Sequence, residues 1–150
     1  MATWKPLNRE QAWTARDFSR AGETFIDYKG QLHEILYSIL TPLGYQVHVS
    51  AQALQHIDKH PSSSKHKSDI SHILNNPDLV TPNPEDPKRH IFYKTLHGKA
   101  LLAVTVHMKN GIRYVTTMYT MPCIKGLRQK RLASNQFLYL RGGFKWKNWK

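Results

Sequence analysis

The pair Asn110-Gly111 constrains the fold of this chain more than any other local feature. It lies between two runs, Lys99–Met108 and Ile112–Met121, in which apolar and polar residues alternate. Asn-Gly between such runs is the strongest short-range signal of a β-hairpin. A further run of the same kind, Arg89–Leu96, precedes them. Residues 89–121 are therefore predicted to form a three-stranded antiparallel meander.

Helices are expected mainly before this meander. The predicted helices are Asn8–Ala21, Leu32–Leu40, 51–60 with Ser50 as its N-cap, and Asp69–Asn75. The predicted strands outside the meander are Thr24–Tyr28, Tyr45–Val49 and Gln136–Leu140, and Pro77–Lys88 is expected to be a loop. In the helix after Ser50, the buried stripe is expected to be Ala51, Leu54 and Ile57. Helices followed by a sheet predict an α+β domain.

The length and cysteine content limit the class of protein. A chain of 150 residues is typical of one domain. We expect a single domain over 1–150, with an N-terminal helical and extended segment 1–47, a core 48–124 and a basic aromatic tail 125–150. Cys123 is the only cysteine, so neither an internal disulfide nor a cysteine metal cluster is possible, which fits a reducing compartment.

No targeting or membrane segment is expected. The N-terminus lacks the apolar core of a signal peptide, and the longest apolar stretch, Ala100–Val106, is too short to cross a bilayer. These features predict a soluble protein made in the cytoplasm, without a membrane partner. They also fit a toxin that reaches the cytoplasm of a target cell as part of something larger.

Positive charge is concentrated in the second part of the chain. Residues 87–150 contain 14 of the 22 Lys and Arg and no acidic residue, whereas residues 1–86 contain all 10 Asp and Glu. A positive field attracts polyanions, of which nucleic acid is the commonest. The alternative is a basic surface kept for solubility, although such a surface would normally mix both signs. The candidate substrate-binding residues are Arg89, His107, Arg113, Lys125, Arg128, Lys130, Arg131, Trp146 and Trp149.

His56 and His60 are the first candidates for chemistry. They lie four residues apart, so they share one face of the predicted helix, and Pro61 keeps His60 at the helix C-terminus. Imidazole has an ordinary pKa of about 6.5, which suits proton transfer near neutral pH. One alternative is a metal site, although no Glu follows His56 and no third ligand is marked by spacing. Another is a pair of histidines with no chemical role.

The meander supplies further candidates. Lys94 lies on its first strand, where a cation can neutralise charge that develops on a phosphate, and the alternative is an ordinary outward-facing lysine. Arg113, Thr117 and Tyr119 share one face of the last strand because side chains alternate along a strand. Cross-strand hydrogen bonding is the alternative role for the threonines. His107 ends the middle strand and can point toward the same site.

The order of these pieces resembles that in the phage-associated nucleases of the barnase, EndoU, colicin and RelE superfamily. The resemblance covers about residues 48–121 and is carried by Ser50–Pro61, Ile73–Val80, Ile91–Lys94, Leu102–Val106 and Tyr114–Tyr119. It implies a helix pair leading into a twisted antiparallel sheet. It also implies RNA cleavage without metal or cofactor: a base deprotonates the ribose 2′-hydroxyl, which attacks the adjacent phosphate, and an acid protonates the leaving 5′-oxygen.

The resemblance also implies roles for particular residues and partners. The helix histidine of the family corresponds to His60, with His56 beside it, the strand cation to Lys94, and the hydroxyl groups of the sheet to Thr117 and Tyr119. Barnase-like members use a glutamate base, and this chain has no carboxylate after Asp86. The implied partners are RNA, tRNA included, and an acidic immunity or antitoxin protein.

Two other functions fit the same residues. The first is a nucleic-acid-binding protein without catalysis, in which Phe144, Trp146 and Trp149 stack on bases. The second is a DNase that uses a histidine-bound metal. RNA cleavage in the presence of EDTA separates the leading hypothesis from both.

The charge distribution generates a first prediction. Affinity for single-stranded RNA should fall steeply as salt rises, because cations that neutralise phosphates release counterions. The logarithm of the association constant should fall with the logarithm of the salt concentration by about 0.7 per neutralised phosphate. Fluorescence anisotropy of a labelled oligonucleotide measures this slope, and an affinity independent of salt would contradict the prediction.

Overall fold

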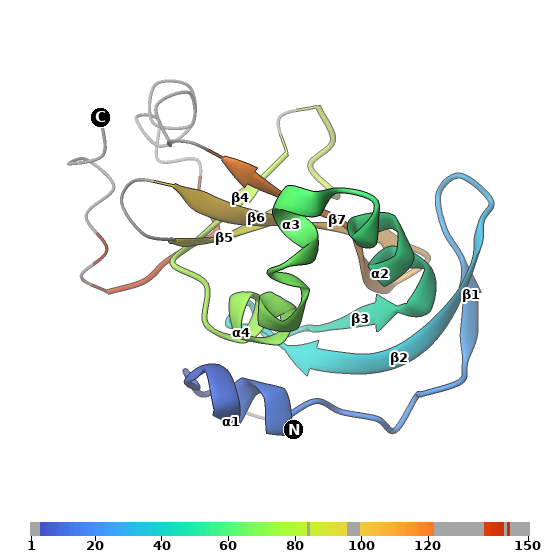
Figure 1. The fold of residues 1–150 in the computed structure, drawn as a ribbon, viewed down its shortest axis with the longest axis horizontal. Helices are drawn as coiled ribbons and strands as arrows, with labels where there is room; N and C mark the ends of the chain where they lie inside the picture. The colour runs from blue at the N-terminus through green and yellow to red at the C-terminus, as the bar shows by residue number, and fades with distance from the viewer. Residues whose placement is uncertain (1–3, 84, 96–99, 122–136, 143, 145–150) are drawn as a thin grey trace.

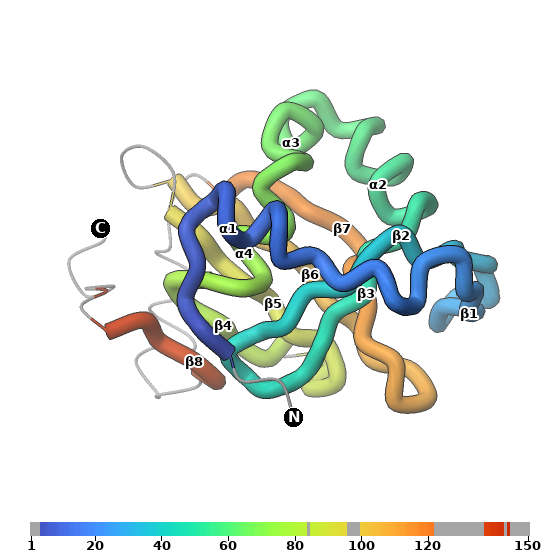
Figure 2. Tube along the Cα trace, turned by 90° about the horizontal axis from the view of Figure 1, so that it is seen from below, coloured from blue at the N-terminus to red at the C-terminus, as the bar shows by residue number. Residues whose placement is uncertain are grey.

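A computed structural model describes residues 4–83, 85–95, 100–121, 137–142 and 144. The helices are α1 (Arg9–Thr14), α2 (Ala51–Asp58), α3 (Pro61–Ser64) and α4 (Ile70–Asn75), with a 3-10 turn η1 (Lys67–Asp69) before α4. The strands are β1 (Thr24–Ile26), β2 (Leu32–Leu40), β3 (Gln46–Ser50), β4 (Leu79–Pro82), β5 (His90–Thr95), β6 (Leu101–Lys109), β7 (Ile112–Met121) and β8 (Tyr139–Leu140). They form one sheet in the order β1-β2-β3-β7-β6-β5-β4-β8, with β1 and β8 at opposite ends (Figure 2).

The predicted meander is confirmed. β6 pairs with β5 on one side and β7 on the other, both antiparallel. At the β6–β7 turn, φ is 54° for Asn110 and 78° for Gly111, the positive values that a two-residue hairpin turn requires. The far side of β7 pairs with β3, and this pairing is parallel, with His48 opposite Tyr114. The sheet is therefore mixed rather than purely antiparallel.

The segment Leu32–Leu40 is a strand, so the predicted helix is wrong. Its apolar residues have helical spacing, but the segment pairs with β1 and β3 as a strand. Its buried residues are His33 and Ile35 before a register shift, and Tyr37, Ser38 and Ile39 after it. Two of these positions hold His33 and Tyr37, which a search for apolar residues does not count. A register shift between Ile35 and Tyr37 adds a further irregularity. Buried polar side chains thus conceal the strand.

The α+β class is confirmed, but the order of helices followed by a sheet is wrong. Along the chain, the strands β1 to β3 precede α2, α3 and α4, and these helices connect β3 to β4 (Figure 1). The expected helix Asn8–Ala21 is limited to α1, whose capping box is formed by Asn8 and Gln11. The expected loop Pro77–Lys88 contains the strand β4. The expected strand Gln136–Leu140 is represented by the two residues of β8, and Gln136 lies outside the described residues.

The main core lies between the helices and one face of the sheet (Figure 1). The helices α2 and α4 contribute Ala53, Ile57, Ile70, Ile73 and Leu74, and the sheet contributes Val47, Val49, Phe92, Leu102, Val104 and Val115 among others. Ser50 caps α2 as predicted, since its hydroxyl accepts the Ala53 N–H. In the expected stripe, Ile57 is buried, Leu54 is partly buried, and Ala53 is buried in place of Ala51.

A smaller core covers part of the opposite face. It contains Leu79, Ile91, Tyr93, Leu101, Ala103 and Phe144. Ile91 and Tyr93 of β5 belong to this core, whereas Phe92 belongs to the main core, as the alternation along a strand requires. Phe144, which was considered for base stacking, is only 8% exposed because it packs here.

Asn75, at the end of α4, connects three distant segments. Its side-chain oxygen accepts the Leu7 N–H at 3.1 Å, and its side-chain amide donates to the Leu40 carbonyl at 3.1 Å. Its backbone carbonyl accepts a hydrogen bond from the Trp4 indole. Asn75 is buried, so the Leu7 N–H and the Leu40 carbonyl would lack a partner without its side chain.

Replacement of Asn75 is therefore expected to destabilise the fold. Asn75→Ala should lower the free energy of unfolding by about 2–3 kcal/mol, because the Leu7 N–H and the Leu40 carbonyl lose their partner in a buried place. Urea denaturation measures the change. The exposed Ser62→Ala serves as the control and should stay within about 0.5 kcal/mol. A loss for Asn75→Ala no larger than that of the control would contradict the prediction.

Candidate active site

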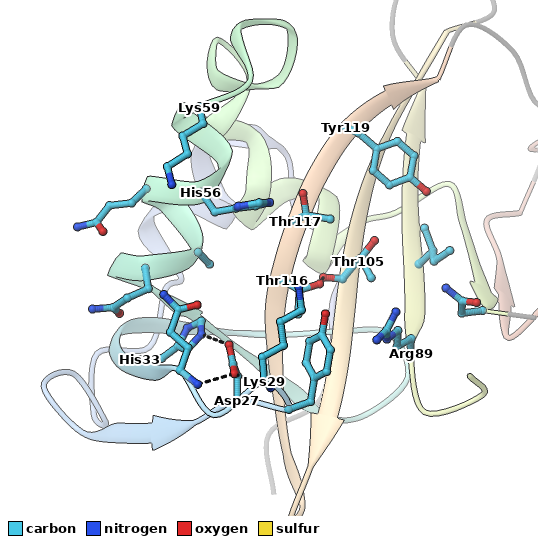
Figure 3. Close-up of a pocket in the computed structure, with 17 residues that line it drawn as sticks. Asp27, Lys29, His33, His56, Lys59, Arg89, Thr105, Thr116, Thr117 and Tyr119 are labelled. Carbon is cyan, nitrogen blue, oxygen red and sulfur yellow. Dashed lines mark hydrogen bonds and ion pairs between the residues drawn. The ribbon is translucent and has the colours of Figure 1, made fainter. Parts of the chain in front are cut away.

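A polar pocket of about 560 Å³ opens between α2, the turn after β1 and the strands β5, β6 and β7 (Figure 3). We call it the first pocket. Its charged, imidazole and hydroxyl-bearing lining residues are Asp27, Tyr28, Lys29, His33, His56, Lys59, Arg89, Thr105, Thr116, Thr117 and Tyr119. Five parts of the chain that are separate in sequence therefore contribute chemical groups to one space.

The strand pairing explains why these parts meet. The helix α2 starts directly after β3, and β3 lies beside β7 in the sheet. The first turns of α2 therefore face the middle of β7. There the register shifts: Thr105 pairs with Thr117 but Val106 with Val115, so Thr116 is an extra residue in β7. Both Thr116 and Thr117 line the pocket, although strict alternation predicts opposite faces.

Of the predicted histidine pair, His56 reaches the first pocket. Its ring points from α2 toward Thr117 on β7 (Figure 3). His60 lies just beyond the helix with an extended backbone, φ −114° and ψ 100°, as Pro61 predicts. The two rings meet edge to face with their centroids 5.4 Å apart. His60 is not one of the residues that line the pocket, so it contacts His56 without reaching the pocket itself.

The surroundings of His56 favour its neutral form. Partial loss of hydration lowers the pKa of the His56 imidazole, and the positive charges of His60, Lys59 and Lys29 lower this pKa further. A histidine whose pKa lies below its ordinary value is largely unprotonated at neutral pH. His56 is thus suited to accept a proton.

A buried chain of hydrogen bonds holds one wall of the pocket. The Asp27 carboxylate lies 2.8 Å from Nε2 of His33, and Nδ1 of His33 lies 2.6 Å from the hydroxyl of Ser50, the N-cap of α2. The same carboxylate accepts the N–H groups of Lys29 and Gln31. Burial on its own would raise the pKa of Asp27, but these hydrogen bonds outweigh burial and hold the pKa below its ordinary value. Asp27 therefore stays charged and fixes the turn that carries Lys29 relative to α2.

Three cations surround this arrangement. Lys29 comes from the turn after β1, Lys59 from the C-terminus of α2, and Arg89 from the start of β5. The carboxylate of Asp27 is the one acidic side chain among the described residues of the lining. The pocket therefore has a positive balance of charge and is suited to a phosphate group.

The structure places Lys94 away from the first pocket. It shares the face of β5 with Phe92 and points toward the end of α4, where its Nζ donates to the Asn76 carbonyl at 2.6 Å. Nζ also lies 3.6 Å from the buried carboxylate of Asp78. Burial lowers the pKa of Lys94, although Asp78 opposes this shift. The residue therefore has a local structural partner.

The other predicted residues divide into three groups. Arg89, Thr117 and Tyr119 line the first pocket with His56. Arg113 stacks over the Tyr45 ring at 3.9 Å, and His107 lies against Tyr28, beside the pocket rather than in it. Lys125, Arg128, Lys130, Arg131, Trp146 and Trp149 lie outside the described residues.

Sequence reasoning missed Asp27, Lys29, His33 and Lys59. A signal existed for Lys29, which lies beside Gly30 directly after a predicted strand, and Gly30 has a positive φ of 83°. Lys59 lies between the two candidate histidines in the sequence. No local signal marked His33, because its segment was predicted to be a helix.

Comparison with known proteins identifies one family. A family model described as phage-Barnase-EndoU-ColicinE5/D-RelE like nuclease3 matches residues 30–126. No curated protein and no solved structure matches the chain. Within the described ranges, no group of three or more His, Cys, Asp or Glu side chains is arranged to hold a metal ion. No described helix is long and apolar enough to span a membrane.

The electrostatics of the pocket generate a prediction for His56. Lys59→Gln should raise the pKa of His56, because the change removes a positive charge that disfavours the imidazolium form. A histidine NMR titration measures this pKa. Lys65→Gln removes an exposed charge from a residue that does not line the pocket and is the matched control. An equal pKa in the two variants would show that Lys59 does not act on His56.

Proposed function

This chain belongs to the phage-Barnase-EndoU-ColicinE5/D-RelE like nuclease family, and from that premise we propose that it is an endoribonuclease. In this proposal the first pocket holds one phosphodiester of an RNA strand. The ribose 2′-hydroxyl attacks that phosphate, and the products are a 2′,3′-cyclic phosphate and a 5′-hydroxyl. The reaction needs no metal ion, because side chains supply the positive charge.

The observation that carries the proposal is the position of His56 among cations and hydroxyl groups. His56 lines the pocket, its ring points toward Thr117, and its pKa lies below the ordinary value (Figure 3). A neutral imidazole in this place can take the proton of the 2′-hydroxyl. We therefore assign the base to His56. His60, whose ring contacts that of His56, acts through its effect on the pKa of His56.

Lys29, Lys59 and Arg89 take the part that the sequence suggested for Lys94. Negative charge grows on the phosphate oxygens as the 2′-oxygen attacks, and fixed cations stabilise this charge more strongly in a partly enclosed site than in water. The three cations come from three separate elements, so they can surround a phosphate from several sides. Lys94 is left out because it is directed to Asp78 and Asn76 on the other face of β5.

The hydroxyl groups of β7 complete the proposed mechanism. We assign to the Thr117 hydroxyl a hydrogen bond to a phosphate oxygen, since Thr117 lines the pocket opposite α2. The neighbouring Thr116 hydroxyl donates to the Thr105 carbonyl at 3.3 Å and so supports this wall. Tyr119 presents a phenol on the same wall, two residues beyond Thr117. We assign to this phenol the proton that the leaving 5′-oxygen requires. After cleavage, His56 releases its proton to solvent and the Tyr119 phenolate takes up a proton from solvent, so both side chains return to their starting forms.

The proposed partners follow from charge. RNA, tRNA included, is the expected substrate, and an acidic immunity or antitoxin protein is expected to inhibit by covering the positive pocket. The cytoplasm of the producing cell or of a target cell is the expected place of action.

The proposal predicts unequal effects of the two histidines. His56→Ala should lower the single-turnover rate about a hundred- to ten-thousandfold, about 3–5 kcal/mol of transition-state stabilisation, because the positioned base is lost. His60→Ala should lower it far less and shift the acidic limb of the pH–rate profile upward, since His60 lowers the pKa of His56. The assay uses RNA in EDTA, and mass spectrometry identifies the fragment ends.

Lys65→Gln is the control for a lost surface charge and should keep full activity. A folded His56→Ala variant with full activity would refute the assignment of the base. Fragments with 5′-phosphate ends would refute attack by the 2′-hydroxyl. A protein that binds RNA but leaves it intact would support the alternative of a binding protein, and activity lost in EDTA would support a metal-dependent DNase or RNase.

A further inference from the structure

A second pocket of about 450 Å³ adjoins the first. Tyr28 and Arg89 line both pockets, so these two side chains form the boundary between them. The second pocket continues along Lys88, His107 and Lys109, next to the β6–β7 turn. The two pockets therefore follow one another along the molecule.

The boundary between the pockets is held by contacts of its own. The ring of His107 stacks on Tyr28 with centroids 4.4 Å apart and 16° between their planes. The Nε–H of Arg89 donates to Nδ1 of His107 at 2.9 Å, and the guanidinium carbon lies 4.8 Å from the centre of the Tyr28 ring. His107 is 6% exposed and is packed as a support. Arg89 is thus fixed between two spaces, where it can contact a group in either.

The second pocket attracts anions. Its charged lining residues are Lys88, Arg89 and Lys109 against the single carboxylate of Asp86. Asp86 accepts the Lys88 N–H at 3.0 Å and lies 3.7 Å from Nε of Arg89. Lys109 donates to the Asp27 carbonyl at 2.9 Å, which ties the second pocket to the turn of the first. The balance of these side chains stays positive.

The available chemistry is that of a phosphate site rather than of a base-stacking site. His107 covers one face of Tyr28, and the Arg89 guanidinium also lies against this ring. A nucleobase would have to displace one of these contacts to stack there. The ammonium groups of Lys88 and Lys109 and the guanidinium of Arg89, by contrast, suit a phosphodiester.

We propose that the second pocket binds the phosphodiester next to the one that is cleaved, so that one RNA strand spans both pockets across Arg89. This inference rests on the proposed function of the first pocket. It makes the preferred substrate a single strand with at least two consecutive phosphodiesters. Arg89 contacts both phosphates or the link between them, and Lys88 contacts the flanking phosphate alone.

The test compares 2′-O-methyl oligonucleotides with one and with three phosphodiesters, which cannot be cleaved by 2′-hydroxyl attack. Isothermal titration calorimetry at several salt concentrations gives their affinities. The longer ligand should bind more tightly and with a steeper dependence on salt. Lys88→Gln should reduce this advantage and lower the salt slope for the longer ligand by about 0.7, the contribution of one phosphate contact. Lys65→Gln is the control for a lost surface charge and should change neither affinity.

The outcomes separate this inference from the proposed function. Equal affinities for the two ligands, or a Lys88→Gln protein with the same salt slope as the Lys65→Gln control, would overturn the subsite even if the protein cleaves RNA. The expected dependence on length and on Lys88, in a protein that leaves unmodified RNA intact, would support the subsite and reject the proposed cleavage. Failure to bind either ligand would overturn the subsite as well.

Discussion

The parallel pairing of β3 with β7 is the contact on which the site depends. It joins the N-terminal strands to the meander, with His48 opposite Tyr114. Since α2 begins directly after β3, this pairing also sets the helix beside the middle of β7. His56 and Thr117, which are far apart in the chain, then face the same pocket. A parallel pair requires a long connection between its strands, and here that connection contains α2, α3, α4 and β4 to β6.

Around this contact, one carboxylate organises a site whose charge is otherwise positive. The Asp27 carboxylate accepts hydrogen bonds from two backbone N–H groups and pairs with His33. His33 in turn lies against Ser50, the N-cap of α2. The charge of Asp27 therefore goes into fixing the turn, while Lys29, Lys59 and Arg89 remain directed to the pocket. The same positive surroundings lower the pKa of His56. Phosphate binding and the pKa of His56 are thus linked. Each cation near the pocket attracts a phosphate and also lowers the pKa of the His56 imidazole.

Local signals were reliable where the physical cause was local. Asn110-Gly111 predicted its turn because few residues adopt positive φ, and Ser50 predicted the start of α2 because its hydroxyl caps a nearby N–H. The strand Leu32–Leu40 was missed because burial of His33 and Tyr37 depends on neighbours that are distant in sequence. The assignment of Lys94 failed to match the pocket for a similar reason. The alternation of side chains along a strand predicts that Lys94 shares a face with Phe92. Only the packing of α4 shows that this face is the one turned away from the pocket.

The sequence by itself determined the meander, the helix that carries His56, the α+β class and the concentration of positive charge after residue 86. Each of these follows from neighbours within a few residues or from composition. Tertiary structure decided which histidine reaches the pocket, brought Asp27 and Lys29 into it, and turned both Thr116 and Thr117 toward it through an irregular strand register. These outcomes depend on how β3 and β7 align, and that alignment is set by side chains that meet only after the chain has folded.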